Sequence, residues 1–463
     1  TLIAITALFF AFFSCKDNRV AHSRDSIDTV NAERWGFSRP LINLKRPVVL
    51  LISSDGFRYG YHWKVALPAI DRLRSNGTEA VPGMISVYPT LTFPNHYSIA
   101  TGLFPASHGI VSNYFTDPSM SHQDDDDDDD DDKDKDKAEE SFHPGATDPK
   151  WWKYGEPIWE SVIKNGLVAA TYFWPGSDVS KGAWNCSLPY CHSYNSSIPY
   201  EERVETILHY FDIEDEEKRP SFLTLYFEEP DHSGHLYGPD DPHIDEAITH
   251  VDQVIGKLLE GLETRGILDD VSLIFLSDHG MVGTCDKKII YLEDLLPWIE
   301  IKREWVDSLS PIFALRPPSS KNKDGDGNNV NEVYKNMTLA LSSGKVPNAE
   351  YLKVYLKDEL PTRLHYCGSD RIAPIIGLVS EGYKVEMKRS KAKECGGAHG
   401  YDNQALSMHP IFIAHGPQFA RGRQMPSFVN TEVYNIITSI LGIQGAPNNG
   451  SSSFVDTILL PSV

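Results

Sequence analysis

The chain has 463 residues, of which 41% are hydrophobic, and this is enough for one large folded domain or two ordinary ones. Its formal net charge of −22 is uneven, because 13 acidic residues and 3 lysines lie between Asp124 and Glu140. Neither that stretch nor the remainder has the basic stripe of a nucleic-acid groove, so an anionic substrate would have to be attracted by local charge such as a bound metal.

The first 15 residues, TLIAITALFFAFFSC, are almost entirely apolar. A run of this length suits a signal peptide or part of a signal anchor better than a buried strand or helix, and only an uncleaved segment would contact a membrane. Residues 16–45 are polar and without a pattern, and are predicted to form a stalk. Five Asn-x-Ser/Thr triplets favour the secretory pathway, with the protein at the cell surface or extracellular. The triplets begin at Asn76, Asn185, Asn195, Asn336 and Asn449.

Apolar runs that end in polar residues recur along residues 46–463, which we expect to form one domain. Such runs are typical of strands that are buried on both faces of a parallel sheet. Helices with one apolar face are predicted between them, which indicates an α/β fold with a mostly parallel central sheet flanked by helices. The predicted strands lie at 47–56, 221–231, 271–280 and 410–416, and the predicted helices at about 156–166, 201–211, 240–265 and 431–441.

An acidic insertion at about residues 121–145 interrupts this domain. The consecutive aspartates of residues 124–132 repel one another and cannot pack, so we expect a solvated loop in preference to a calcium site. Residues 322–332, NKDGDGNNVNE, faintly resemble a calcium-binding loop, but the glutamate falls one position early for an EF-hand and no helices flank it. A turn-rich loop is the prediction there.

Three of the predicted strands end at or near an aspartate, and histidines lie beside two of these aspartates. Because the carboxyl ends of parallel strands meet at one edge of a sheet, we expect these side chains to form one site. Equal numbers of carboxylates and imidazoles suit zinc, and six ligands can hold two ions with three ligands each. The candidate ligands are Asp55, Asp231, His235, Asp278, His279 and His399.

Thr92, in PTLTFPNH, precedes a proline and a plausible helix, which places its hydroxyl at a helix N-terminus. Beside metal ions such a hydroxyl ionises more readily and acts as a nucleophile. An N-capping threonine is the simpler interpretation of this residue alone. The ligand set favours the nucleophile.

The six cysteines are compatible with the secretory route. Cys186 and Cys191 are close enough for a local disulfide. Cys285 follows the SDHGM motif and Cys395 precedes GGAHG, so these two must approach each other if both motifs meet at the metals. Cys367 would then lie outside a disulfide.

Seven motifs resemble, in order, those of the ectonucleotide pyrophosphatase/phosphodiesterase family of the alkaline phosphatase superfamily, with plant-type members the most similar. The resemblance covers about residues 46–445 and implies an alkaline-phosphatase-like fold, with residues 46–463 as the catalytic domain. It also implies a zinc-dependent hydrolase that releases a nucleoside 5′-monophosphate from nucleotide triphosphates, nucleotide sugars or dinucleotides. The motifs are SSDGFRYGY, PTLTFPNHYSIATGLFPASHGI, GEPIW, TYFWPGSDV, YFEEPDHSGHLYGPDD, SDHGM and GAHGYDN.

The resemblance implies a role for each residue of the centre. Thr92 would attack phosphorus and form a phospho-threonine intermediate. Asn113 would donate a hydrogen bond to a non-bridging phosphate oxygen. The implied ligands are Asp231, His235 and His399 for one Zn²⁺, and Asp55, Asp278 and His279 for the other.

A substrate pocket is implied beside the centre. Phe93 and Tyr194 would stack on the two faces of a nucleobase, as in nucleotide-cleaving members. Trp174, Asp178 and Tyr226 fall at further pocket positions, although core packing is the plainer interpretation, above all for Trp174.

The sequence departs from the family pattern where a phosphate tail would be held. Leu91 stands where animal nucleotide-cleaving members often have a lysine, and the lysine near GEPIW is shifted, with Lys153 and Tyr154 as candidates. Two alternative functions stay open: a choline phospholipid phosphodiesterase of the same fold, and a catalytically inactive cell-surface binding protein. The aromatic pair favours nucleotides over the first, and the intact ligand set argues against the second.

Overall fold

A computed structural model describes residues 34–120, 141–318, 330–389 and 395–462. The predicted signal segment, nearly all of the acidic insertion and most of the loop predicted at 322–332 lie outside the described residues. Within the described ranges, no helix has both the length and the apolar character that crossing a membrane requires.

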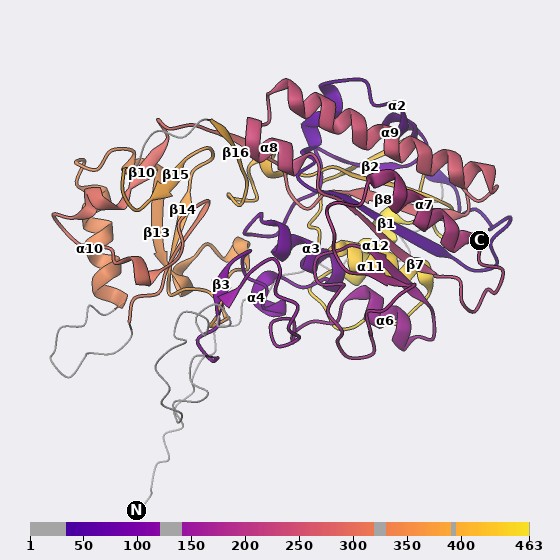
Figure 1. Cartoon of the computed structure of the whole chain (residues 1–463), viewed down its shortest axis with the longest axis horizontal. Coiled ribbons are helices and arrows are strands. Elements are labelled where there is room, and N and C mark those ends of the chain that lie inside the picture. Colours follow the sequence, from indigo (N-terminus) through magenta and orange to yellow (C-terminus); the bar gives the residue numbers. More distant parts are fainter. Residues whose placement is uncertain (1–33, 121–140, 319–329, 390–394, 463) are drawn as a thin grey trace, which may run out of the picture.

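The larger part of the molecule is built on an eight-stranded sheet in the order β18-β2-β17-β8-β1-β7-β5-β6 (Figure 1). Neighbouring strands run parallel, except that β17 pairs antiparallel with both β8 and β2. The predicted mostly parallel sheet is confirmed. The run at 410–416 forms the antiparallel strand, and its apolar sequence did not reveal this because a strand buried on both faces is apolar whichever way it runs. The strands are β1 (Val48–Ser54), β2 (Thr78–Val81), β5 (Ala169–Tyr172), β6 (Cys191–His192), β7 (Phe222–Phe227), β8 (Val271–Leu276), β17 (Phe412–His415) and β18 (Arg423–Pro426).

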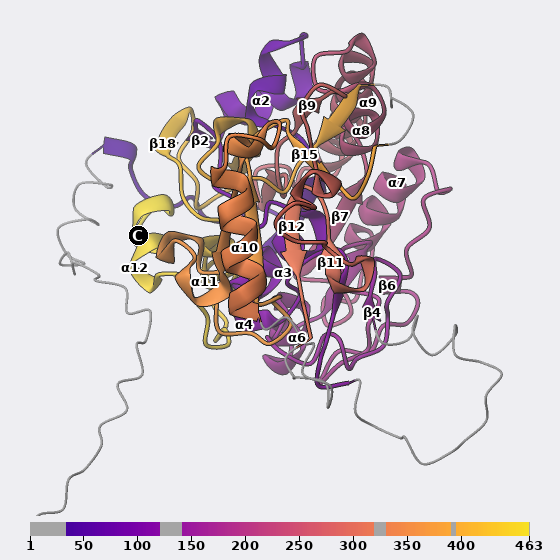
Figure 2. The same cartoon turned by 90° about the vertical axis from the view of Figure 1, so that its left-hand side faces the viewer.

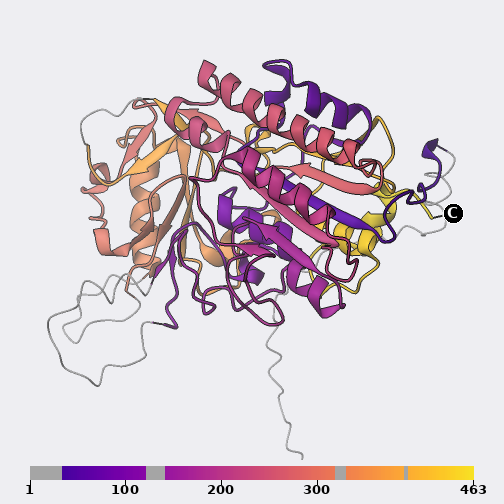
Figure 3. The same ribbon diagram turned by 45° about the vertical axis from the view of Figure 1, so that its right-hand side comes forward.

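Helices cover both faces of this sheet (Figures 1 and 3). α2, α7 and α9 pack on one face in a core that includes Ile255, and α3, α6, α11 and α12 pack on the other in a core that includes Ile437. α9 begins where the Asp241 side chain accepts a hydrogen bond from the His243 N–H. The helices are α2 (Pro68–Ser75), α3 (Thr92–Thr101), α6 (Ile158–Lys164), α7 (Tyr200–Phe211), α9 (Pro242–Thr264), α11 (Glu432–Leu441) and α12 (Ser452–Ile458).

A smaller lobe with its own sheet lies beside the main sheet, and α10 covers it (Figure 2). Its four strands are all antiparallel, in the order β11-β12-β14-β13, and its core includes Phe313, Met337 and Ile375. The apolar runs considered in the sequence do not predict this second sheet. Its elements are β11 (Val306–Ser308), β12 (Ile312–Leu315), α10 (Val330–Ser342), β13 (Leu352–Leu356) and β14 (Ile375–Val379), with β10 (Ile289–Tyr291) and β15 (Lys384–Glu386) paired nearby.

Two segments at the edges of the fold refine the expected organisation. In the second half of the segment predicted as a stalk, Ser38 N–H donates to the Pro461 carbonyl (2.9 Å) and Leu44 N–H donates to Asp270 (2.8 Å), so this part lies on the body. β3 (Phe115–Thr116) and β4 (Ser141–Phe142) pair antiparallel, so β4, inside the bounds of about 121–145 predicted for the acidic insertion, belongs to the folded body.

Candidate active site

Three adjacent strands bring three carboxylates to one edge of the sheet. β1 lies between β7 and β8, and Asp55, Asp231 and Asp278 follow the carboxyl ends of these strands. The Asp231 N–H donates to the Asp55 carbonyl (3.0 Å), which ties the two loops together. Gly56 permits this contact, since it has φ +66° and a Cβ there would lie 2.8 Å from the Asp231 Cβ.

The first predicted ligand set, Asp231, His235 and His399, forms one cluster. α8 (Asp231–Tyr237) places Asp231 and His235 on one helical face, four residues apart. The Nε2 atoms of His235 and His399 lie 3.0 Å apart and 3.5 and 3.4 Å from Asp231 oxygens. Each Nδ1 donates to a carbonyl, of Gly397 (3.0 Å) and Thr90 (2.9 Å) respectively, so both Nε2 lone pairs point at the same place. Two facing lone pairs beside a carboxylate fit a cation between them.

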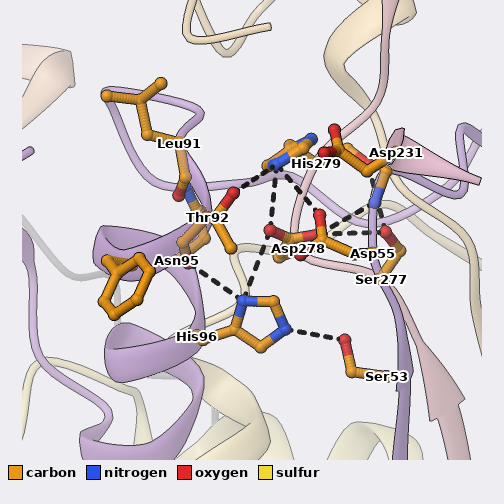
Figure 4. A network of polar contacts seen from close by, with 12 residues as sticks. Ser53, Asp55, Leu91, Thr92, Asn95, His96, Asp231, Ser277, Asp278 and His279 are labelled. Atoms are coloured by element: carbon orange, nitrogen blue, oxygen red, sulfur yellow. Dashed lines mark hydrogen bonds and ion pairs between the residues drawn. The ribbon is translucent and has the colours of Figure 1, made fainter. Parts of the chain in front are cut away.

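In the second predicted set, Asp55, Asp278 and His279, the histidine lies close to both carboxylates (Figure 4), but the groups compact enough to hold an ion combine Asp55 and His279 with Asp231, and Asp55 and Asp278 with His96. His279 Nε2 lies 3.3 Å from Asp55 Oδ1 and 3.0 Å from Asp278 Oδ2, while its Nδ1 donates to the Gly280 carbonyl (2.9 Å). Asp55 also groups with Asp231 and His279, so the two clusters share a border. Burial lowers the pKa of His279, but the Asp278 carboxylate outweighs it and raises the pKa overall, so a proton and a metal ion compete for this nitrogen.

The chemistry of this donor set fits metal ions. Asp55 Oδ1, Asp231 Oδ1 and Asp278 Oδ2 are buried and have no hydrogen-bond partner within the described residues. Burial, with the Asp278 and Asp231 carboxylates beside it, raises the pKa of Asp55 well above its usual range. Burial, with His279 and His235 beside it, holds the pKa of His399 well below its usual range and keeps the ring neutral, as a metal ligand must be. Carboxylate and neutral imidazole together are a zinc-type ligand set.

Thr92 is the first residue of α3, and its hydroxyl faces the second cluster (Figure 4). Its Oγ1 lies 3.3 Å from His279 Nε2. The N-cap of α3 is Leu91, and no side chain caps this end, so the hydroxyl does not have the capping role that was the alternative. The next N–H, of Phe93, donates to Asn113 Oδ1 (2.9 Å), and this bond turns the amide group of Asn113 toward the same helix end.

A cavity of about 190 Å³ opens beside Thr92. All five residues predicted for a substrate pocket line it: Phe93, Trp174, Asp178, Tyr194 and Tyr226. Phe93 is half-buried, and Tyr194 is 52% exposed at the rim, so a planar group between them would cover both rings.

Two of these residues also hold the centre in place. Tyr226 O–H donates to Asp55 Oδ2 (2.6 Å), and Trp174 Nε1–H donates to the His96 carbonyl (3.1 Å). Trp174 is therefore both a packed core residue and part of the pocket wall. The two interpretations offered by the sequence, core packing and a pocket position, are compatible.

Sequence reasoning missed three other aromatic residues that line this cavity, Trp152, Phe173 and His192. Trp152 lies in a turn, Phe173 directly follows β5 and His192 belongs to β6, so they share no sequence period. Phe173 has φ +59°, a conformation that costs a non-glycine residue energy and that clusters at functional sites. The aromatic density of TYFWPGSDV is the one sequence signal that points to it.

A second, wider groove of about 790 Å³ opens on the other side of the centre. Leu91, Asn113, His235 and His399 line its inner end. Four basic residues line it farther out: Arg303, Lys384, Lys388 and Arg389. The predicted candidates Lys153 and Tyr154 line neither this groove nor the aromatic cavity, and the Lys153 Nζ lies over the Tyr154 ring, 4.9 Å from its centroid.

Both predicted disulfides are confirmed. Cys186 pairs with Cys191, and Cys285 pairs with Cys395. The second disulfide joins the ends of β9 (Val282–Thr284) and β16 (Gly396–Ala398), which pair antiparallel. It therefore links the loop that carries Asp278 and His279 to the one that carries His399. Cys367 belongs to neither disulfide.

Comparison with known sequences identifies related proteins. A family model described as type I phosphodiesterase/nucleotide pyrophosphatase matches residues 49–402. Human ectonucleotide pyrophosphatase/phosphodiesterase family member 1 is 40% identical over 418 residues, which are 89% of this chain and 42% of that protein. Venom phosphodiesterase 2 of Crotalus adamanteus is 38% identical over 421 residues, which are 89% of this chain and 47% of that protein. The chain thus spans less than half the length of these curated relatives.

Solved structures give the same picture. Murine ectonucleotide pyrophosphatase/phosphodiesterase 5, solved as an inactive threonine-to-alanine variant in complex with AMP, superposes with a TM-score of 0.75 at 32% identity. The match covers 89% of this chain and 100% of that chain. Human ectonucleotide pyrophosphatase/phosphodiesterase 5 matches with a TM-score of 0.75 at 31% identity, over 89% of this chain and 99% of that one.

Proposed function

The chain belongs to the type I phosphodiesterase/nucleotide pyrophosphatase family, and we propose that it hydrolyses phosphodiester and diphosphate linkages of nucleotides, releasing a nucleoside 5′-monophosphate. One observation carries this proposal. The Thr92 hydroxyl lies at the head of α3 between an aromatic cavity and two clusters of carboxylate and imidazole ligands. The murine relative named above, inactive as a threonine-to-alanine variant and solved with AMP, supports both the nucleophile and the substrate class.

In the proposed reaction, Phe93 and Tyr194 hold the nucleobase, and the phosphorus atom lies at the Thr92 hydroxyl. The Thr92 oxygen forms a bond to phosphorus as its proton passes to solvent, and the bond from phosphorus to the leaving oxygen breaks with its electron pair on that oxygen. Asn113 donates its amide N–H to a non-bridging oxygen. Water then hydrolyses the phospho-threonine ester, which restores Thr92 and releases the nucleoside monophosphate.

Two Zn²⁺ ions, when bound, would supply positive charge to the attacking oxygen, the phosphoryl group and the leaving oxygen. Asp231, His235 and His399 would hold one ion. Asp55, Asp278 and His279 would hold the other.

The leaving group would enter the wide groove on the far side of the centre. Lys388 lines that groove, together with Asp307 and Glu386, so a cation for a phosphate tail lies there although Leu91 replaces the lysine often found before the nucleophile. This arrangement suits triphosphates, nucleotide sugars and dinucleotides, because the groove is wider than the base cavity.

We further propose that residues 1–15 are a signal peptide or signal anchor, that residues 16–45 connect it to the catalytic domain of residues 46–463, and that the protein enters the secretory pathway. The two disulfides support that route.

A choline phospholipid phosphodiesterase is the second candidate, and the cavity itself favours it in one respect. Trp152, Phe173 and Trp174 line the cavity, and aromatic faces also bind quaternary ammonium groups. Turnover of a p-nitrophenyl nucleotide ester, p-nitrophenyl phosphorylcholine and p-nitrophenyl phosphate separates the candidates. We expect the highest kcat/KM for the nucleotide ester. Preference for the phosphorylcholine ester would establish the second candidate, and no turnover of any substrate by zinc-loaded protein would indicate a binding protein.

A further inference from the structure

His96 lies one helical turn after Thr92 and is not among the predicted ligands or pocket residues. Its side chain is fully buried, and both ring nitrogens have partners (Figure 4). Nδ1 lies 2.9 Å from the Thr92 carbonyl and 3.3 Å from Asp278 Oδ2. Nε2 lies 2.8 Å from Ser53 Oγ. One imidazole therefore contacts the three elements that carry the nucleophile and two predicted ligands.

The partners decide where the ring proton lies. A carbonyl and a carboxylate only accept hydrogen bonds, so Nδ1 carries the proton, and Nε2 accepts from the Ser53 hydroxyl. Ser53 belongs to β1, two residues before Asp55. In this tautomer the single ring of His96 contacts the end of β1, the region after β8 and the first turn of α3.

The position of its ring proton distinguishes His96 from the predicted metal ligands. Asp55, His96 and Asp278 are close enough together to form a metal-binding group. However, the nitrogen of His96 that lies near Asp278 is the protonated Nδ1. The lone pair of the ring is on Nε2 and points toward Ser53. His279 differs, because its Nδ1 donates to the Gly280 carbonyl and its Nε2 lies 3.0 Å from Asp278 Oδ2, where a metal ion would replace a proton.

The ring is also held from the side. It packs edge-on against Trp174 and Tyr226, with ring centroids 5.0 and 5.3 Å away. Both of these residues line the aromatic cavity, and the Trp174 indole N–H is bonded to the His96 backbone. His96 cannot rotate without disturbing the cavity wall, so its orientation is determined by packing as well as by hydrogen bonds.

We infer that His96 is a positioning residue, which orients the Thr92 turn beside Asp278 through the bond from its Nδ1–H to the Thr92 carbonyl and is itself oriented by Ser53. This inference rests on the proposed function, because alignment matters only if Thr92 is the nucleophile. His96 contacts neither substrate nor metal in this role. Its loss should therefore reduce kcat and leave KM and the number of bound metal ions unchanged.

A pair of nearly isosteric variants tests the inference. In His96→Asn the side-chain amide N–H takes the place of Nδ1–H, whereas in His96→Gln the amide lies near the Nε2 position and the Nδ1 donor is lost. We expect kcat for the nucleotide ester to fall about 10-fold in His96→Asn and about 100-fold in His96→Gln, since a misplacement of about 1 Å can cost a factor of 100. KM should change less than about twofold, and zinc content should stay at two ions per chain in both variants.

Several results would overturn this role. Equal kcat in both variants, or a higher kcat in His96→Gln, would show that the Nδ1–H does not align the centre. A zinc content of one ion per chain in His96→Asn would make His96 a ligand. If neither variant folds, Ser53→Ala decides, because it removes only the partner of Nε2: a kcat lowered several-fold supports the role, and a parental kcat refutes it. Parental turnover in Thr92→Ala would instead refute the proposed function.

Discussion

The position of one proton on each imidazole defines the candidate site. His235, His279 and His399 each donate Nδ1–H to a backbone carbonyl and point Nε2 into the carboxylates. Backbone groups thus orient these rings, and at His279, whose pKa Asp278 raises, a metal ion would replace a proton on Nε2. His96 has the same Nδ1 tautomer but lies on the other side of the carboxylates, so its donor, and not its lone pair, faces them.

Thr92→Ala should abolish turnover and leave the fold and two bound zinc ions intact. The hydroxyl supplies the attacking oxygen, whereas six other side chains hold the metals. The loss should amount to several orders of magnitude in kcat, and it is measured together with zinc by elemental analysis. Thr92→Ser is the matched control, since it keeps a hydroxyl and should retain more activity than the alanine variant. Activity of Thr92→Ala within about tenfold of the parent would exclude a covalent role.

Phe93→Ala and Tyr194→Ala should each weaken the use of nucleotide substrates. Loss of one stacking face costs about 1–3 kcal/mol, which lowers kcat/KM by roughly 5- to 150-fold at about 1.4 kcal/mol per tenfold. A small non-nucleotide phosphodiester should be affected much less, because it does not reach the base cavity. Tyr351→Ala, at a half-buried tyrosine of the smaller lobe that lines neither cavity, serves as the control. Equal losses for both substrates would show that the pair is structural.

The order of β8, β1 and β7 explains how distant sequence segments form one centre. β1 is central, and the strands on its two sides come later in the chain, so the loops after all three strands open at the same edge. α3 enters this edge from the loop after β2, and the pairing of β9 with β16 brings His399 to it. The Cys285–Cys395 disulfide closes that last connection covalently.

The junction between α3 and α4 (Pro105–His108) should make folding stability depend on pH. Burial lowers the pKa of His108 to about 3, and the neutral ring accepts from Ile110 N–H (3.1 Å) and contacts Ser98 Oγ (2.9 Å). Between its ordinary pKa of 6.5 and about 3, the unfolded chain binds a proton there and the folded chain does not. The free energy of unfolding should therefore fall as the pH falls through this window, by up to about 1.4 kcal/mol per pH unit from this group.

Urea unfolding of the parent and of His108→Gln, both with chelator, measures this contribution as a difference between two pH profiles. The profile of His108→Gln should be flatter between pH 6.5 and about 3. Ser98→Ala is the control, because it removes a partner of the ring but retains the titrating group, so it should lower stability without flattening the profile. Parallel profiles for the parent and His108→Gln would contradict the expectation.

At the scale of the whole molecule, the centre lies at the carboxyl ends of the central strands of the large sheet, beside the smaller lobe. The larger part supplies the six predicted ligands and the aromatic cavity, while Lys384 and Lys388 reach the groove from the chain between β14 and β16. In the proposed function, recognition of the base and of the leaving group would thus be divided between different parts of the fold. This division lets the two substrate halves be tested separately.

Deletion of residues 124–137 should leave kcat/KM for the nucleotide ester nearly unchanged. This acidic run lies outside the described residues, and its charge should affect an anionic substrate little at physiological ionic strength, where the Debye length is about 8 Å. The flanking strands β3 and β4 must be kept, because Phe142 of β4 packs against the Phe93 ring at 5.7 Å between centroids. A large loss of activity with two zinc ions still bound would assign the run a functional role.

The sequence by itself was sufficient for the fold class and for the convergence of aspartates and histidines at one edge of the sheet. Buried parallel strands are continuous apolar runs, and residues at their carboxyl ends meet wherever such strands are neighbours, so Asp55, Asp231 and Asp278 could be placed together before any coordinate was known. The same convergence predicted the Cys285–Cys395 disulfide, which the structure contains.

Only the tertiary structure decided the rest, because it depends on contacts that no local pattern records. The antiparallel sheet of the smaller lobe pairs β12 with β14 across about 60 residues, and its register comes from packing. Trp152, Phe173 and His192 meet in the aromatic cavity from a turn, the end of β5 and strand β6. His96 resembles any buried histidine in the sequence. Its orientation follows from Ser53 on one side and the Thr92 carbonyl on the other, and hydrogen-bond direction becomes defined only when the chain has folded.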